Sequence, residues 1–84
     1  NKQVLKAYDH LLMMIENNPQ ANPSHWLTCH LRKAEIYKRM GEVQNYANEC
    51  RLGLRKQWKD PLSKPGQEAL AKMRGFLEEL KTKQ

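Results

Sequence analysis

The sequence predicts an all-α fold of four antiparallel helices that pair as helical hairpins. Two observations support this prediction: apolar residues recur every three or four positions in four segments, and Pro or Gly residues separate those segments. No segment shows the alternating pattern of a strand. The 84 residues should form a single domain, which is long enough to fold without disulfide or metal staples.

The first helix is expected over residues 2–17. Its apolar residues form a wide stripe, so the helix should be buried on two sides; they are Val4, Leu5, Tyr8, Leu11, Leu12, Met14 and Ile15. Asn18 precedes Pro19, and a residue before proline is disfavoured in the α conformation. We therefore expect the helix to end there.

The second helix is expected over residues 24–40. Two starts are open: Asn22 caps a helix whose first residue is Pro23, or Ser24 caps it one step later. Its inward residues should be Trp26, Leu27, Leu31, Ala34, Tyr37 and Met40. Gly41 can adopt the left-handed conformation of a helix C-cap. The chain should therefore reverse at this glycine.

The third helix is expected over residues 42–59, with the Glu42 carboxylate favourable at its positive end. Asp60-Pro61 should end it, and Pro65-Gly66 should precede the last helix, over residues 66–81. The inward residues of that helix should be Ala69, Leu70, Met73, Phe76, Leu77 and Leu80.

The residues around Gly41 resemble a tetratricopeptide (TPR) repeat, a 34-residue unit of two antiparallel helices. Ala34, Tyr37 and Gly41 match the small, aromatic and glycine positions of its first helix. Cys50 and Gly53 match the large and small positions of its second helix. Residues that depart from the pattern are His30, Lys33 and Tyr46.

The first helix resembles the second half of a preceding TPR unit, through the spacing of Ala7, Leu11, Met14 and Pro19. The resemblance covers about residues 4–58 and implies the C-terminal end of an array, closed by a capping helix. An unrelated four-helix bundle is the alternative. Because the chain begins at Asn1 without a methionine, we expect it to be part of a longer protein.

The TPR resemblance implies a protein–protein interaction or scaffold module. The concave face of the second helix would present Leu31, Glu35, Lys38 and Arg39. Lys38 and Arg39 could receive the carboxylates of a partly acidic peptide or helix, while Leu31 and Ile36 offer apolar contact.

A small basic nucleic-acid-binding module is the alternative function. The formal net charge is +6, and the third helix carries Arg51, Arg55, Lys56 and Lys59 beside Trp58. These cations could neutralise phosphates, and an exposed Trp58 could stack on a base. The same charges also complement the helix dipole, and Trp58 continues the apolar register of the helix. No helix-turn-helix or RNA-binding signature is present.

A homo-oligomer formed through the first helix is a further expectation. This helix carries more apolar surface than one neighbour can cover, and Met13 lies outside its main stripe. A second copy or a partner chain could cover the excess.

The sequence favours a protein that is not an enzyme and has no cofactor or metal. The histidines and cysteines are not spaced as a zinc site, and there is no Gly-rich phosphate loop. Cys29 and Cys50 should lie about one turn apart, which favours reduced thiols and an intracellular setting, in the cytoplasm or nucleus. The longest apolar run, residues 11–15, is far below the ~20 residues that span a membrane.

Overall fold

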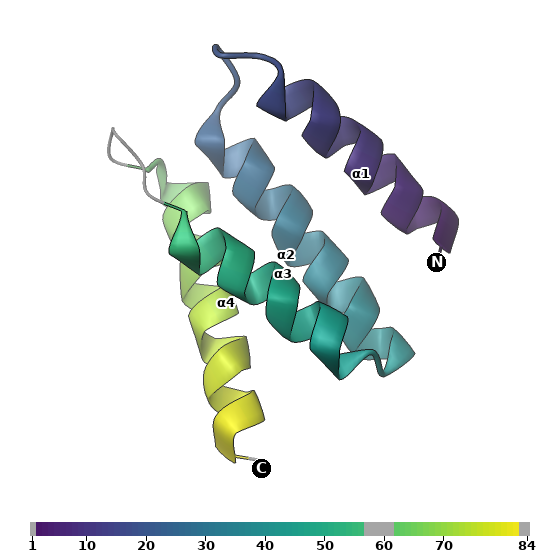
Figure 1. The fold of residues 1–84 in the computed structure, drawn as a ribbon. Coiled ribbons are helices and arrows are strands. Elements are labelled where there is room, and N and C mark those ends of the chain that lie inside the picture. The colour runs from purple at the N-terminus through teal and green to yellow at the C-terminus, as the bar shows by residue number, and fades with distance from the viewer. Residues whose placement is uncertain (1, 57–61, 83–84) are drawn as a thin grey trace.

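The computed structural model describes residues 2–56 and 62–82 of the chain (Figure 1). Within these residues it contains four helices and no strand, so the all-α prediction is confirmed. The helices are α1 (Lys2–Glu16), α2 (Pro23–Met40), α3 (Val43–Arg55) and α4 (Lys64–Thr82).

The central element is α2, which packs against each of the other helices. Figure 1 shows α1, α2 and α3 side by side with alternating chain direction, while α4 runs at an angle to α2 and α3. Among the described elements, α1 contacts α2 alone, whereas α4 contacts both α2 and α3. The α2–α3 hairpin therefore provides the surface on which the other two helices pack.

The hairpin turn forms as the sequence predicts. Gly41 has a φ of 76° and caps α2 in the left-handed conformation. Its N–H donates to the carbonyl oxygen of Lys38 at 3.2 Å, and the Glu42 N–H donates to that of Tyr37 at 2.9 Å. These two bonds satisfy carbonyls that the helix end leaves open, and α3 begins two residues after the glycine.

Asn22 is the N-cap of α2, which decides between the two predicted starts. Its side-chain oxygen accepts a hydrogen bond from the Ser24 N–H at 2.9 Å, and Pro23 occupies the first helical position. The Ser24 hydroxyl also hydrogen-bonds to the hydroxyl of Ser63, just before α4. A Cβ atom at Gly66 would lie 2.7 Å from the Ser24 Oγ, so the starts of α2 and α4 are in close contact.

Two predicted boundaries are wrong. Helix α3 ends at Arg55 and Lys56 is extended, whereas the prediction placed the end near residue 59. The predicted roles of Trp58 and of Asp60-Pro61 fall outside the described residues. Helix α4 begins at Lys64, two residues earlier than predicted, because a proline in the first turn has no N–H that needs a helical partner.

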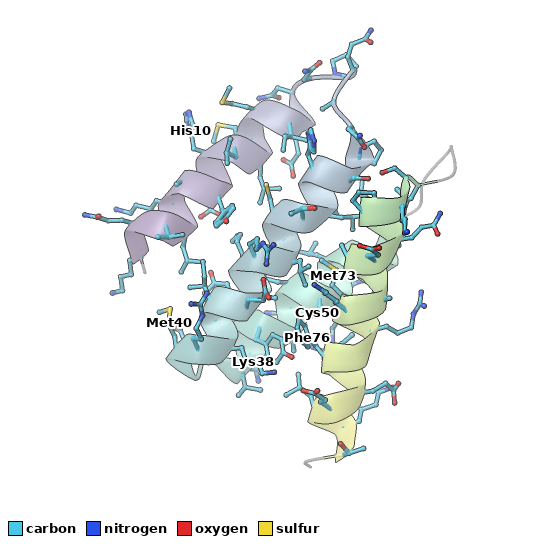
Figure 2. All side chains as sticks on the ribbon, turned by 180° about the vertical axis from the view of Figure 1, so that it is seen from behind. His10, Lys38, Met40, Cys50, Met73 and Phe76 are labelled. Atoms are coloured by element: carbon cyan, nitrogen blue, oxygen red, sulfur yellow. The ribbon has the colours of Figure 1, made fainter. Side chains whose placement is uncertain are left out.

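The core lies where α2, α3 and α4 meet. Leu27, Cys50 and Met73 are fully enclosed there, and Figure 2 shows Cys50 and Met73 between the crossing helices. The buried cluster extends along α2 to α1; its members are Leu12, Trp26, Leu27, Cys29, Leu31, Ala34, Tyr46, Cys50, Ala69 and Met73.

Helix α1 is covered on one face only, which corrects the prediction that it is buried on two sides. Leu5 and Leu12 are buried against the rest of the domain. Val4, Leu11 and Met14, from the same predicted apolar stripe, are about half exposed. The reason is that α2 is the only described helix that contacts α1.

Candidate functional site

The α2 face that the sequence predicts as a docking surface is largely occupied within the domain. Leu31 is only 4% exposed and belongs to the core, and Ile36 is also buried, so neither offers apolar contact to a partner. Glu35 accepts a hydrogen bond from Arg32 on the same helix at 2.8 Å. Arg39 is exposed.

Helix α4 accounts for the fourth predicted residue, Lys38. The Lys38 Nζ lies 3.5 Å from a carboxylate oxygen of Glu79 and 4.9 Å from the centre of the Phe76 ring. It also lies 5.9 Å from the centre of the Tyr46 ring on α3. Figure 2 shows Lys38 and Phe76 close together at this crossing. A cation near aromatic faces is attracted to them, so Lys38 contributes to the packing of α4 against the hairpin.

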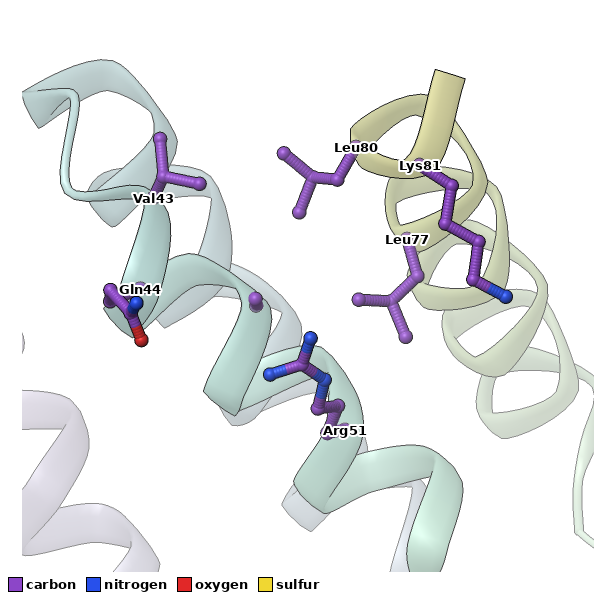
Figure 3. A pocket seen from close by; sticks show the side chains of 7 residues that line it. Val43, Gln44, Arg51, Leu77, Leu80 and Lys81 are labelled. Atoms are coloured by element: carbon purple, nitrogen blue, oxygen red, sulfur yellow. The ribbon is translucent and has the colours of Figure 1, made fainter. Parts of the chain in front are cut away.

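A groove of about 320 Å³ lies between α3 and α4. In Figure 3, Leu77 and Leu80 project from α4 toward α3, where Val43 stands at the first position of the helix. Both leucines are partly buried, and Val43 is 49% exposed. The groove, which we call the α3–α4 groove, is lined by Val43, Gln44, Ala47, Arg51, Leu77, Leu80 and Lys81.

Basic side chains border this apolar floor. Arg51 is exposed and lines the groove from α3, two turns beyond Val43 (Figure 3). Lys81 lines it from α4, with its Nζ 3.8 Å from a carboxylate oxygen of Glu78. Because both partners of that ion pair are exposed, the pair is weak and Lys81 can exchange Glu78 for another carboxylate. The groove therefore combines apolar contact with positive charge.

The predicted nucleic-acid residues divide between two surfaces. Arg51 belongs to the α3–α4 groove. Arg55 and Lys56 border a second hollow, of about 180 Å³, with Trp26 and Leu52. The Lys56 Nζ lies 4.5 Å from the centre of the Trp26 ring. Lys59 lies outside the described residues.

A buried cluster of charged side chains links α1, α2 and α3. One Glu49 oxygen lies 2.6 Å from the Nδ1 of His30, and the other lies 3.3 Å from the Nζ of Lys33. Lys33 also contacts a carboxylate oxygen of Asp9 at 2.6 Å. The side chains of Lys33 and Glu49 are each only 10% exposed. The Lys33–Glu49 pair between α2 and α3 is therefore shielded from bulk water, whereas Asp9 extends the cluster to α1 with a side chain that is 58% exposed.

Two opposing effects act on the pKa of Lys33. Burial lowers it, but the hydrogen bonds and charges of Asp9 and Glu49 raise it by more, so the net pKa is above its ordinary value. The sequence marks this cluster only indirectly: His30 and Lys33 are polar residues at apolar positions of the TPR pattern. Nothing in the spacing identified Glu49 as their partner.

The buried thiols and phenol are held in their neutral forms. Burial raises the pKa of Cys50 to about 11 and that of Tyr46 to about 12, and it also raises the pKa of Cys29. Both cysteines are free thiols. A nucleophilic cysteine needs a lowered pKa and access to solvent, and neither thiol has them. Within residues 2–56 and 62–82, no group of three or more metal-binding side chains lies together.

Comparisons of the chain with protein-family models, with curated proteins and with solved structures give no match. None of the described helices combines the length and apolar character required to cross a bilayer.

Proposed function

We propose that this domain is a protein-interaction module that docks an acidic amphipathic helix of a partner protein in the α3–α4 groove. The observation that carries the proposal is the combination in one groove of the exposed Val43, the partly buried Leu77 and Leu80, and the cations Arg51 and Lys81. The second-helix face that the sequence suggested is not part of the proposal, because Leu31 is buried and Lys38 is engaged by α4.

The shape of the groove favours a helix as the occupant. Its walls are two helices, and its apolar residues lie along them one turn apart: Val43 and Ala47 on α3, Leu77 and Leu80 on α4. An amphipathic helix binds such a groove with apolar side chains spaced by three and four residues. The large apolar side chains of that helix would complete the burial of Val43 and Leu80.

The charge of the domain favours an acidic partner. Carboxylates beside the apolar stripe of the incoming helix would meet Arg51 and Lys81 at the edges of the groove. The net charge of +6 attracts such a helix from a distance, which raises the association rate more than it raises the final affinity.

We also propose a TPR-like arrangement, with α2 and α3 as one repeat and α4 as the capping helix. The support is the pattern of helix contacts: each helix packs against the next, and α4 covers both members of the hairpin. The setting that we propose is intracellular, in the cytoplasm or nucleus, where two buried free thiols stay reduced.

Nucleic-acid binding through α3 remains the alternative, because Arg51 and Arg55 are exposed and one turn apart. It predicts a different behaviour in salt. Binding through phosphates weakens steeply and log-linearly as salt rises, whereas docking through apolar contact weakens much less.

Fluorescence anisotropy with two labelled probes tests the proposal. The first probe is a synthetic helical peptide with leucines three and four residues apart and glutamates beside them; the second is a short DNA duplex. Val43→Gln removes apolar contact inside the groove, and Leu52→Gln is its matched control, since Leu52 is 46% exposed on α3 outside the groove. We expect Val43→Gln to weaken peptide binding roughly fivefold, which corresponds to about 1 kcal/mol of lost apolar burial.

Leu52→Gln should leave peptide affinity unchanged, and a peptide of scrambled sequence should bind poorly. Equal affinity of the Val43→Gln variant and the natural protein would contradict the docking site. If the duplex binds tightly and the double variant Arg55→Gln/Lys56→Gln abolishes that binding while Val43→Gln does not, the alternative function holds instead.

A further inference from the structure

We propose that the outer face of α1 pairs with the same face of a second copy of this chain, with the two helices antiparallel. This surface is separate from the α3–α4 groove, because α1 contacts neither of the helices that form the groove. The proposal therefore stands or falls independently of the proposed function.

The outer face carries an apolar stripe, which we call the α1 stripe: Val4, Ala7, Leu11 and Met14. At about 100° per residue these four lie within an arc of roughly 80°. Val4, Leu11 and Met14 are 45%, 46% and 58% exposed, respectively. Leu5 and Leu12, which are buried, lie on a different side of the helix. Next to the stripe, His10 points away from the other helices in Figure 2.

The spacing of the α1 stripe suits one further helix. Its steps of three, four and three residues are those of the a and d positions of a heptad, the narrow seam by which two helices pack. In an antiparallel pair centred on Asp9, Ala7 faces Leu11 of the second copy, and Val4 faces Met14 of the second copy. Each shorter side chain then meets a longer one, which fills the space between the helices.

The parallel arrangement fills that space less well. In a parallel pair with the two helices in register, identical residues face each other. Ala7 then faces Ala7 of the second copy, which leaves a gap between two bulkier pairs, Val4 with Val4 and Leu11 with Leu11. Voids of this kind lose contact energy. The antiparallel arrangement also opposes the two helix dipoles favourably.

The charge pattern favours a second copy over an acidic partner. The polar residues beside the α1 stripe, Gln3 and His10, carry no formal charge at pH 7. Lys6 lies roughly 120° around the helix from the centre of the stripe. Two chains of net charge +6 can approach through such a face without opposing their cations, whereas a surface for an acidic helix would place lysine or arginine beside the stripe.

The interface is small. The stripe spans the eleven residues from Val4 to Met14, or roughly 15 Å of helix, and the contact should bury less than the ~1,200 Å² typical of stable complexes. We therefore expect a dimer that forms at high micromolar concentration and dissociates on dilution.

Sedimentation equilibrium between about 10 µM and about 1 mM protein tests the pairing. We expect the mean mass to rise from 9.9 kDa toward twice that value. Leu11→Glu should weaken dimerisation at least tenfold, and Leu52→Glu is its control, because Leu52 has the same exposure of 46% on α3. Met14→Glu replaces Leu11→Glu if circular dichroism shows that the latter loses helix content.

Cross-linking tests the antiparallel register. Under mild oxidation, the variant Val4→Cys mixed with the variant Met14→Cys should form a disulfide-linked pair, while either variant alone should not. A monomer at all concentrations, an equal effect of Leu11→Glu and Leu52→Glu, or efficient cross-linking of Val4→Cys alone would each overturn the proposal.

Discussion

Gly53 of α3 lies so close to Met73 of α4 that a Cβ atom on Gly53 would come within 2.9 Å of the Met73 Cε, and closer still to its Sδ. Met73 is fully buried, so a Cβ atom on Gly53 would force its side chain to shift inside the core. The absence of a side chain at Gly53 thus allows α4 to approach α3 closely at this point. The same approach forms the two walls of the α3–α4 groove.

Gly53→Ala should therefore destabilise the domain. The added methyl group overpacks the contact with Met73 at a cost of about 1–3 kcal/mol, which the better helix propensity of alanine offsets by about 1 kcal/mol. Gly75→Ala is the matched control, because nothing lies within 4 Å of a Cβ there, and it should stabilise α4 by up to about 1 kcal/mol. Urea unfolding measures both; equal stabilisation by the two variants would contradict the close contact.

The buried cluster around Glu49 predicts a large loss on removal of one charge. Among the described residues, Glu49→Gln leaves Lys33 with Asp9 as its one anionic partner, and it removes the charge beside His30. Breaking a buried pair costs about 3–5 kcal/mol. Glu35→Gln breaks the more exposed pair with Arg32 and should cost less than about 1 kcal/mol. If urea unfolding shows that both variants lose a similar amount of unfolding free energy, the Glu49 cluster does not stabilise the packing of the helices as a buried ion pair.

Lys38 should matter for stability and not for partner binding. Lys38→Gln removes the cation above Phe76 and the contact with Glu79, which we expect to cost about 0.5–1 kcal/mol because the side chain is partly exposed. The peptide affinity should be unchanged, since Lys38 does not line the groove. Arg39→Gln, on the exposed neighbour, should change neither quantity. If Lys38→Gln lost peptide binding, that result would contradict docking in the α3–α4 groove and would support docking on the exposed side of α2.

Alkaline pH should destabilise the domain from about pH 9 upward. Folding raises the pKa of Cys50 from 9.0 to about 11 and that of Tyr46 from 10.0 to about 12, and it also raises that of Lys33. A pKa raised by folding contributes stability that is complete below the pKa of the unfolded chain. That stability is lost as pH rises through the folded pKa. Thermal unfolding at pH 7.5, 9 and 10.5 should show a falling midpoint.

Tyr46→Phe should reduce that alkaline loss and stabilise the domain at neutral pH. The Tyr46 hydroxyl is buried and makes no hydrogen bond with any described residue, so its removal should raise the unfolding free energy by about 1 kcal/mol. An unchanged pH dependence in Tyr46→Phe would show that the phenol does not contribute to it.

The sequence predicts best those features that depend on a few neighbouring residues, such as turns and helix ends. The turn at Gly41 needs a left-handed residue, and the start of α2 needs a capping side chain such as Asn22; both lie where the sequence places them. The position of α4 is a tertiary effect. Its packing buries Leu31 and engages Lys38, and neither outcome can be derived from the spacing of residues along α2.

The burial of charged side chains cannot be predicted from the sequence for a related reason. Polar residues at helical spacing usually indicate a solvated face, so nothing in the pattern showed that Lys33 and Glu49 meet inside the domain. The α3–α4 groove requires the crossing of two helices, and their close approach at Gly53 and Met73 is a tertiary contact that the spacing of residues along either helix does not show.

The docking of an acidic amphipathic helix in the α3–α4 groove is tested most directly by amide chemical-shift mapping of the ¹⁵N-labelled protein during titration with the leucine- and glutamate-containing peptide. We predict that the largest shift changes cluster at Val43, Ala47, Arg51, Leu77 and Leu80, which line the groove. Changes concentrated instead on Arg55 and Lys56 or along the exposed side of α2, or no changes at all, would contradict this function.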